Sequence, residues 1–219
     1  EMFFEDALKA AEILQITLTS RAKGDERVPM CGVPYHAAKN YIARLVEAGL
    51  KVAVCDQVEE PGKGNQIVRR EVTRVVTPGM LVDDDLLEAR SNNFLCAVAL
   101  GAEGGGLALL DASTGEFFAG EVGTDAALFE EIARSGAREI LLPAALCSGE
   151  RSEALARACP ASIVNPFADE AFEAGRAQSL LESHFGTRGL DGFGLTGLPR
   201  AVGAAGAALR YLKETQRRS

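Results

Sequence analysis

The stretch NFLCAVALGAEGGGLALLDASTGEFFAGEV (residues 93–122) decides the fold class of the C-terminal part of this 219-residue chain. It contains three short apolar runs, NFLCAVAL, GLALLDASTG and EFFAGEV, with tight glycine turns between them. Runs of this length separated by such turns are typical of consecutive antiparallel strands. The stretch therefore predicts a three-stranded antiparallel meander.

The segments after residue 122 alternate between helix and strand. TDAALFEEIARSG (124–136) has helical spacing and starts with Thr124 or Asp125 as its N-cap. Strands are expected at 138–143 and 161–167, and helices at 169–185 and 200–218. Three antiparallel strands, a helix and a further strand fit the start of a ribonuclease-H-like fold. We therefore expect an α/β domain of this type.

The first 80 residues predict a separate α/β unit. A helix is expected over residues 2–14, with one apolar stripe made of Phe3, Phe4, Ala7, Leu8, Ala11 and Leu14. The other expected elements are a strand at 16–19, a polar loop at 21–27, a helix from about Ala38, and strands at 51–58 and 67–76. These elements predict a mixed-sheet α/β domain.

Thr77-Pro78-Gly79 ends this pattern, and an acidic, turn-rich run follows it. The regular periodicity starts again at Asn93. We therefore divide the chain into a first domain at residues 1–78, a linker at 79–92 and a second domain at 93–219.

The composition is that of an ordinary soluble globular protein, with 47% hydrophobic and 25% charged residues. No apolar run approaches the ~20 residues that span a bilayer, so we expect no membrane association. The five cysteines are widely spaced and mostly lie in apolar runs such as VAVC (52–55), and the chain has only two histidines. This pattern favours reduced, buried thiols in a cytoplasmic protein over disulfides or a metal site.

The charge is unevenly distributed along the chain. Residues 1–80 carry eleven basic and eleven acidic residues, whereas residues 81–219 carry twelve and twenty and hold the whole net charge of −8. The total charge argues against nucleic-acid binding, but the neutral N-terminal domain does not share the acidity.

Two basic segments stand out in the N-terminal domain. Arg21, Lys23 and Arg27 follow the first expected strand, and Arg69, Arg70 and Arg74 lie on a later one. Strand alternation places Arg70 and Arg74 on one face and Arg69 on the other. These side chains could contact a phosphate backbone, or they could cover a solvated strand face. The residues alone leave both interpretations open.

Asp111, in LLDASTGEF, is the most enzyme-like residue of the chain. A carboxylate on a central strand followed by a turn of small residues can hold a metal ion in ribonuclease-H-type nucleases. Glu116 and Glu121 are the other carboxylates on these strands, but both lie on one short hairpin and are not expected to converge with it. The alternative is that Asp111 caps the following turn through local hydrogen bonds.

The order of segments resembles the start of the bacterial MutS family of DNA mismatch-recognition proteins. The matching segments are EMFFEDALKAAEILQITLTSR, VPMCGVPYHAAKNYIARLVEAGLKVAVCDQVEEP and VRREVTRVVTPGMLVDDDLLE, followed by LALLDASTGEFFAGEV. The resemblance implies a mismatch-binding domain followed by a ribonuclease-H-like connector domain that is not catalytic.

The resemblance also assigns residues. The family reads a mismatch with a Phe-x-Glu motif, and EMFFEDA aligns Glu1 with the motif Glu, so the Phe is expected two positions before it, outside this sequence. Arg21 and Arg70 match basic residues that contact the DNA backbone, and Lys23 and Arg69 are candidates beside them. Tyr35 and His36, in GVPYHA, are expected to be structural.

For function, the resemblance implies binding of mismatched double-stranded DNA and docking of MutL on the connector. The family's ATP and Mg²⁺ site and its homodimer contacts belong to other domains, so we expect this chain to be monomeric, without cofactor, metal or catalytic residues. Two alternatives remain: a metal-dependent nuclease built around Asp111, and a module that only binds other proteins.

Overall fold

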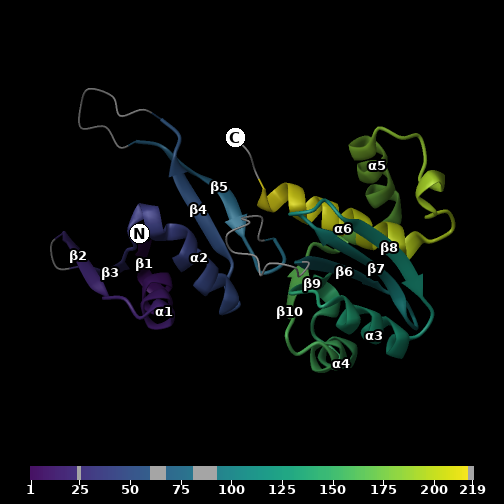
Figure 1. Cartoon of the computed structure of the whole chain (residues 1–219), viewed down its shortest axis with the longest axis horizontal. Helices are drawn as coiled ribbons and strands as arrows, with labels where there is room; N and C mark the ends of the chain where they lie inside the picture. Colours follow the sequence, from purple (N-terminus) through teal and green to yellow (C-terminus); the bar gives the residue numbers. More distant parts are fainter. Residues whose placement is uncertain (24–25, 60–67, 81–92, 217–219) are drawn as a thin grey trace.

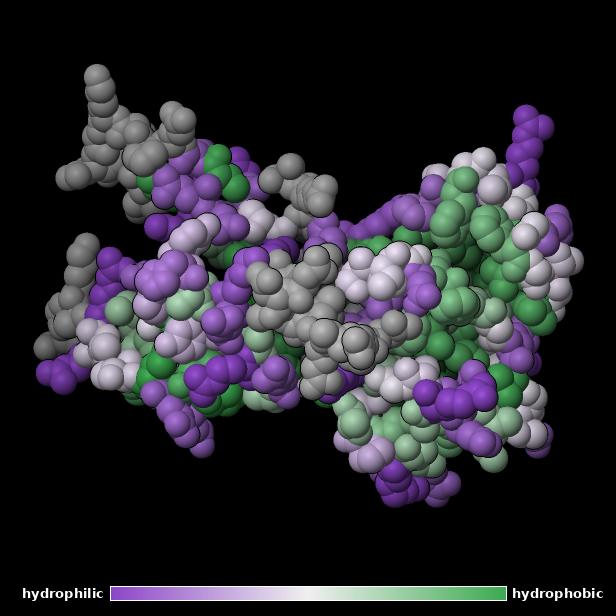
Figure 2. Space-filling view, viewed as in Figure 1, coloured by the Kyte–Doolittle hydropathy of each residue, from purple (hydrophilic) through white to green (hydrophobic). Residues whose placement is uncertain are grey.

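The computed structural model describes residues 1–23, 26–59, 68–80 and 93–216. We call the described residues up to 80 the N-terminal domain and residues 93–216 the C-terminal domain; the outline of the molecule narrows between them (Figure 2). The described strands form three sheets, in the orders β1-β3-β2, β4-β5 and β10-β9-β6-β7-β8. Figure 1 shows that the two small sheets belong to the N-terminal domain and the five-stranded sheet to the C-terminal domain.

The elements have the following bounds. The strands are β1 (Met2–Phe3), β2 (Thr19–Lys23), β3 (Glu26–Cys31), β4 (Val52–Gln57), β5 (Arg70–Val76), β6 (Phe94–Leu100), β7 (Gly105–Asp111), β8 (Phe117–Val122), β9 (Glu139–Pro143) and β10 (Ile163–Phe167). The α-helices are α1 (Phe4–Leu14), α2 (Ala38–Glu47), α3 (Asp125–Ser135), α4 (Glu150–Ala158), α5 (Ala174–Phe185) and α6 (Pro199–Thr215). Short 3₁₀ turns cover Tyr35–Ala37, Ala144–Leu146, Asp169–Phe172 and Asp191–Phe193.

Helix α1 begins at Phe4, because Met2 and Phe3 pair with β3 as strand β1. The predicted apolar stripe is therefore wrong in part: Phe4 is 63% exposed and Leu8 is 48% exposed. The buried face of α1 consists of Ala7, Ala10 and Leu14, which form the core of this domain together with Cys31 and Leu45. Ala7 and Ala10 let the helix lie close to β3, whereas Phe4 and Leu8 point to solvent.

The polar segment at 21–27, which the sequence predicts as a loop, belongs mostly to strands. Strands β2 and β3 pair antiparallel from Thr19 opposite Met30 to Lys23 opposite Glu26. The strand expected at 16–19 accordingly begins only at Thr19. A two-stranded ribbon that projects into water does not need an apolar face, so its sequence lacks the alternation on which the prediction relied.

Strands β4 and β5 form a second antiparallel ribbon, and its register shifts between Val54 and Cys55. Val54 pairs with Arg74 while Cys55 pairs with Val72, so Thr73 is an extra residue in β5. An inserted residue breaks the two-residue alternation of a strand. The prediction that Arg70 and Arg74 share a face is therefore wrong; Arg70 is exposed and Arg74 is half-buried.

The C-terminal domain contains the predicted meander. Strands β6, β7 and β8 pair antiparallel, and β9 lies parallel to β6 on its other side, followed by β10. The resulting order is that of a mixed, ribonuclease-H-like sheet. Alternate residues of β6 point to opposite faces: Leu95 and Ala97 pack in the cluster that contains α6, whereas Cys96 and Val98 pack in the cluster that contains α3 and α4.

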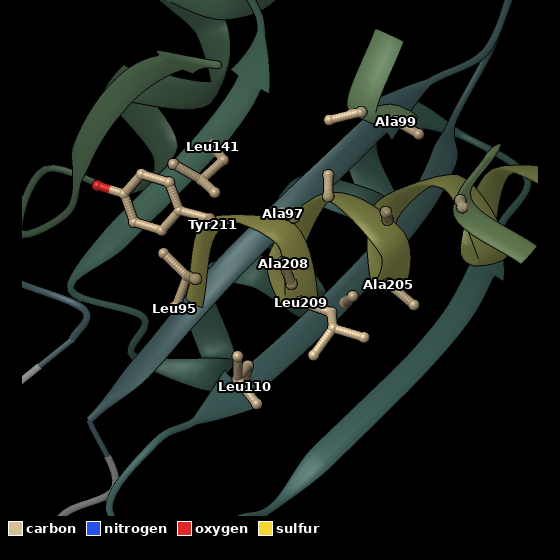
Figure 3. Packing of buried hydrophobic residues seen from close by; sticks show 14 of the residues in the cluster. Leu95, Ala97, Ala99, Leu110, Leu141, Ala205, Ala208, Leu209 and Tyr211 are labelled. Carbon is tan, nitrogen blue, oxygen red and sulfur yellow. The ribbon is translucent and has the colours of Figure 1, made fainter. Parts of the chain in front are cut away.

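Helix α6 lies unusually close to its neighbours because its inner face is made of small residues. A Cβ atom on Gly206 would overlap the Cβ of Ala177 and lie 2.6 Å from its Cα, and one on Gly203 would overlap the backbone oxygen of Phe172. In Figure 3, Ala205, Ala208 and Leu209 of this helix point at the apolar side chains of the sheet. The small-residue helix predicted from the sequence is thus the cover of one sheet face.

The cysteines are all free; Cys31, Cys96 and Cys159 are buried as expected, but Cys55 is exposed. No helix within the described ranges combines the length and apolar character needed to cross a membrane. Of the predicted linker, residues 81–92 lie outside the described residues, whereas Gly79 and Met80 are buried against the C-terminal domain.

Candidate nucleic-acid interface

Glu1 lies at the end of strand β1 and on the surface of the three-stranded sheet. The pairing of Met2 with Cys31 brings it beside Gly32, where a Cβ atom would lie 3.7 Å from the Glu1 Cγ. Glu1 is exposed, and among the described residues no hydrogen bond or ion pair engages its carboxylate. The carboxylate is therefore available to a ligand.

Arg21 lies on the outer strand of the same sheet. It pairs with Val28, and its side chain is exposed. Glu1 and Arg21 are separated by about 13 Å along the strands and by about 10 Å across two strand spacings. Lys23 ends strand β2, and its side chain lies outside the described residues. The sheet thus carries one acidic and one basic candidate at separate points of one surface.

Arg69 and Arg70 lie on the second ribbon, at the end of β5 away from the C-terminal domain (Figure 1). Arg70 pairs with Gln57 across the ribbon, and its side chain is exposed. The guanidinium of Arg69 forms an ion pair with Glu71, and its backbone N–H donates to the Glu59 carboxylate at 3.3 Å. Arg70 is therefore the more available of the two cations.

The structure groups these candidates only in part. Glu1 and Arg21 share one sheet, whereas Arg69 and Arg70 belong to another that is not paired with it. Both ribbons, β2–β3 and β4–β5, project from the side of the molecule away from the C-terminal domain (Figure 1). A long ligand such as duplex DNA could contact both ribbons, whereas a small ligand could not.

Tyr35 and His36 do not form part of the core. Tyr35 is 93% exposed, and His36 is exposed as well. The prediction that they are structural is therefore wrong within the described part of the chain, because neither side chain is buried.

Asp111 has the local role of capping the turn after β7. Its Oδ1 accepts hydrogen bonds from the Ser113 hydroxyl at 2.6 Å and the Ser113 backbone N–H at 2.9 Å, and its Oδ2 accepts the Asn93 backbone N–H at 2.9 Å. Burial raises the pKa of Asp111, but these hydrogen bonds and one from Thr114 outweigh burial and hold the pKa below its ordinary value. Both oxygens are occupied by protein donors.

Glu121, the carboxylate of strand β8, is engaged away from Asp111. Glu121 accepts the backbone N–H groups of Arg200 and Ala201, at 2.7 and 3.2 Å, and so caps the start of α6. Among the described residues, no group of three or more His, Cys, Asp or Glu side chains is placed to hold a metal ion. The turn-capping interpretation therefore describes Asp111.

Sequence reasoning missed one unusual carboxylate. Glu139 starts strand β9 and is completely buried, yet the sequence predicts only a strand at 138–143. The signal was present, because an acidic residue within an otherwise apolar buried strand requires partners. Its partners could not be named from the sequence.

The comparisons with known proteins divide the chain as the sheets do. The sequence model of MutS domain I matches residues 1–85, and that of MutS domain II matches residues 93–219. Over 99% of its length the chain is 58% identical to the DNA mismatch repair protein MutS of Anaeromyxobacter dehalogenans (strain 2CP-C) and 56% identical to that of Myxococcus xanthus (strain DK1622). It spans about a quarter (24%) of the length of these relatives. The chain belongs to the MutS family.

Proposed function

We propose that the N-terminal domain binds mismatched double-stranded DNA and that the C-terminal domain connects this domain to the rest of a mismatch repair protein. The relatives are named DNA mismatch repair proteins. The observation that carries the proposal is the exposed carboxylate of Glu1, which no described residue engages, in a domain that also exposes Arg21 and Arg70. Arginines of this kind neutralise phosphates and fix the register of a protein on a duplex.

A carboxylate within a DNA interface needs a specific partner, because phosphates repel it. The edges of the bases supply such partners, since they carry N–H donors that a carboxylate can accept. An aromatic side chain that wedges between base steps beside such a carboxylate kinks and unstacks the duplex, which costs a few kcal/mol and less where pairing is already defective. Glu1 is therefore proposed to hydrogen-bond a mispaired base, beside a Phe expected two positions before it.

The other assignments belong to the same proposal. We place the domain limits at residues 1–78 and 93–219 with a linker at 79–92, and the contact with MutL on the C-terminal domain. ATP and Mg²⁺, the homodimer contacts and the enzymatic activity are assigned to other parts of the longer protein, which acts in the cytoplasm. This chain is proposed to be a monomeric, non-enzymatic DNA-binding module. Titration with purified MutL tests the docking assignment.

The test of mismatch recognition compares two labelled duplexes that differ by a single mispair. It uses the chain extended at its N-terminus by a segment that places a Phe two residues before Glu1. Fluorescence anisotropy should show tighter binding to the mismatched duplex, and Glu1→Ala should reduce this preference by the ~1–3 kcal/mol that a base contact provides. Glu5→Ala is the matched control, because Glu5 is an exposed carboxylate of helix α1.

Two results would contradict the proposal. An unchanged mismatch preference in Glu1→Ala would show that Glu1 does not contact the mispair. An equal loss of mismatch preference in Glu5→Ala would show that the effect comes from removing a negative charge anywhere on this surface. Cleavage of labelled heteroduplex in Mg²⁺ or Mn²⁺ that disappears in Asp111→Asn would instead favour the nuclease alternative.

A further inference from the structure

Glu139 is an acidic side chain in an apolar place. It begins strand β9, its exposed fraction is 0%, and Ile140, Leu141 and Leu142 after it are equally buried. An ionised carboxylate in such surroundings is costly unless hydrogen bonds and opposite charges compensate it. The groups around Glu139 therefore indicate what it does.

Among the residues that the structure describes, each polar group that contacts the Glu139 carboxylate is a donor or a cation. Its Oε2 accepts the Thr77 hydroxyl at 2.6 Å and the Gly79 backbone N–H at 3.1 Å. Its Oε1 accepts the Tyr211 hydroxyl at 2.7 Å and the Asn165 amide at 2.8 Å, and the Lys51 Nζ lies 3.8 Å away. An ionised carboxylate only accepts hydrogen bonds, so it fits this ring of donors as an amide or an alcohol would not.

The partners come from both domains. Lys51 and Thr77 belong to the N-terminal domain and Gly79 follows it directly, whereas Asn165 lies on β10 and Tyr211 on α6 of the C-terminal domain. The backbone at Gly79 lies very close to the sheet of the C-terminal domain, since a Cβ atom on Gly79 would lie 2.9 Å from the Cβ of Glu139 and 3.1 Å from the Cα of Leu95. One carboxylate thus connects the first domain to two elements of the second.

The N-terminal partners lie at the base of the β4–β5 ribbon. Lys51 immediately precedes β4, and Thr77 immediately follows β5, so both strands are held at the same end. Lys51 also lies over the Tyr211 ring, with its Nζ 5.4 Å from the ring centroid. The opposite end of β5 carries Arg70, about 20 Å away along a seven-residue strand.

Neighbouring contacts support the same end of the ribbon. Met80 is 1% exposed and belongs to the core cluster of the C-terminal domain. Gly49 lies in the loop before β4 and packs closely on β10, since a Cβ atom added to it would lie only 3.1 Å from the Cδ1 of Ile163. The residues around Glu139 therefore form a packed junction between the two domains.

We propose that Glu139 is a positioning residue that fixes the base of the β4–β5 ribbon on strand β9 and helix α6, and so sets the orientation of the N-terminal domain. With this junction intact, a displacement of the Arg70 end of the ribbon is passed to β9 and α6. Without it, the two domains move independently, which is the ordinary behaviour of domains joined by a small interface. This inference goes beyond DNA binding and does not require it.

The test measures the distance between the domains in the DNA-free chain. Nitroxide labels are placed on the exposed native Cys55 of β4 and on Arg157→Cys of α4, in a Cys147→Ser background, because the other cysteines are buried. Double electron–electron resonance then gives the distance distribution. The distance distribution should be narrow in the protein with Glu139. Its width should increase about twofold or more in Glu139→Gln, as expected when the two domains move independently.

Further variants separate positioning from loss of the fold. Thr77→Val and Lys51→Met remove partners without touching the core of the C-terminal domain, and they should broaden the distribution even if Glu139→Ala fails to fold. Glu170→Gln is the matched control, because Glu170 pairs with Arg210 within the C-terminal domain. Circular dichroism confirms that each variant is folded.

The proposal is overturned if the folded Glu139→Gln, Thr77→Val and Lys51→Met variants all keep the wild-type distribution, or if Glu170→Gln broadens it equally. Since no DNA is present, either result leaves the mismatch-binding proposal untouched. Failure of the Glu1 variants to alter DNA binding would in turn leave the junction proposal untouched.

Discussion

The two domains differ in what holds them together. The C-terminal domain packs two apolar clusters against the two faces of one five-stranded sheet, whereas the described residues of the N-terminal domain form one small cluster beside α1 and α2. The two-stranded β4–β5 sheet of the N-terminal domain is supported at one end, where Val52 packs against the N-terminal cluster and the junction around Glu139 holds Lys51 and Thr77. Isolated two-stranded ribbons are marginally stable in water. The C-terminal domain is thus a scaffold, and the N-terminal domain uses it to hold exposed strands in place.

The largest expected effect comes from removing core volume in the scaffold. Leu141→Ala, at a completely buried position of β9, should lower the free energy of unfolding of the C-terminal domain by ~2–5 kcal/mol. Leu45→Ala in the small N-terminal cluster is the matched change. Urea unfolding followed by residue-resolved amide exchange should show that the Leu45 variant leaves the C-terminal domain intact. Global unfolding by Leu45→Ala would contradict the division of roles.

The next effect concerns the close packing of α6. Gly206→Ala should destabilise the C-terminal domain by ~1–3 kcal/mol, because the new methyl group meets the backbone of Ala177 and the gain in helix propensity is only ~1 kcal/mol. Gly175→Ala in α5 is the control, since a Cβ there would meet nothing within 4 Å. Thermal unfolding should separate the two variants; equal melting temperatures would show that α6 can move away without cost.

A comparable effect is expected at the turn that Asp111 caps. Asp111→Asn should cost ~1–3 kcal/mol, because an amide N–H₂ would face the N–H of Asn93. The folded-state pKa of Asp111 is below its ordinary value of ~3.9, so the carboxylate contributes stability above that pH and loses it as pH falls through the folded pKa. Urea unfolding of the wild type and of Asp111→Asn should show a constant difference in the free energy of unfolding near neutral pH. This difference should shrink below pH ~4. A difference that persists unchanged in acid would refute the ionised cap.

The smallest stability effect is expected at Phe4, whose backbone has φ of +55°. This left-handed conformation costs residues other than glycine ~1–2 kcal/mol, so Phe4→Gly should be more stable than Phe4→Ala by about 1 kcal/mol. At Leu8, an exposed position in the interior of the same helix, the order should reverse, with Ala the more stable. Chemical denaturation of the four variants measures their stabilities. The same order of the Gly and Ala variants at both positions would contradict the cost assigned to the Phe4 backbone.

These examples show which features could be read from the sequence. The β6–β8 meander and helix α3 were predicted because their signals are local: apolar runs, glycine turns and the N-cap Thr124, whose Oγ accepts the Ala127 N–H at 3.3 Å. Helix α4 was not predicted, because it is largely polar, and its Arg151 donates to Gly101 and Asp125 far away in sequence. The partners of Glu139 lie between 26 residues (Asn165) and 88 residues (Lys51) away in the sequence, so no local pattern could reveal them.

The site could be predicted only as separate residues. The exposure of Glu1, Arg21 and Arg70 agrees with a surface role, but the bulge at Thr73, which separates Arg74 from the face of Arg70, depends on pairing with β4. The ion pair of Arg69 with Glu71 likewise follows from the geometry of the strand and not from composition.

The central claim, that the N-terminal domain carries the DNA contacts, is tested most directly by the salt dependence of binding to a labelled duplex. Arg21→Ala and Arg70→Ala should each weaken binding and lower the slope of log K against log salt by ~0.9, one phosphate contact apiece. Arg157→Ala and Arg176→Ala, at exposed arginines of the C-terminal domain, should leave the slope unchanged. Equal losses in all four variants, or an unchanged slope in the first two, would contradict the account.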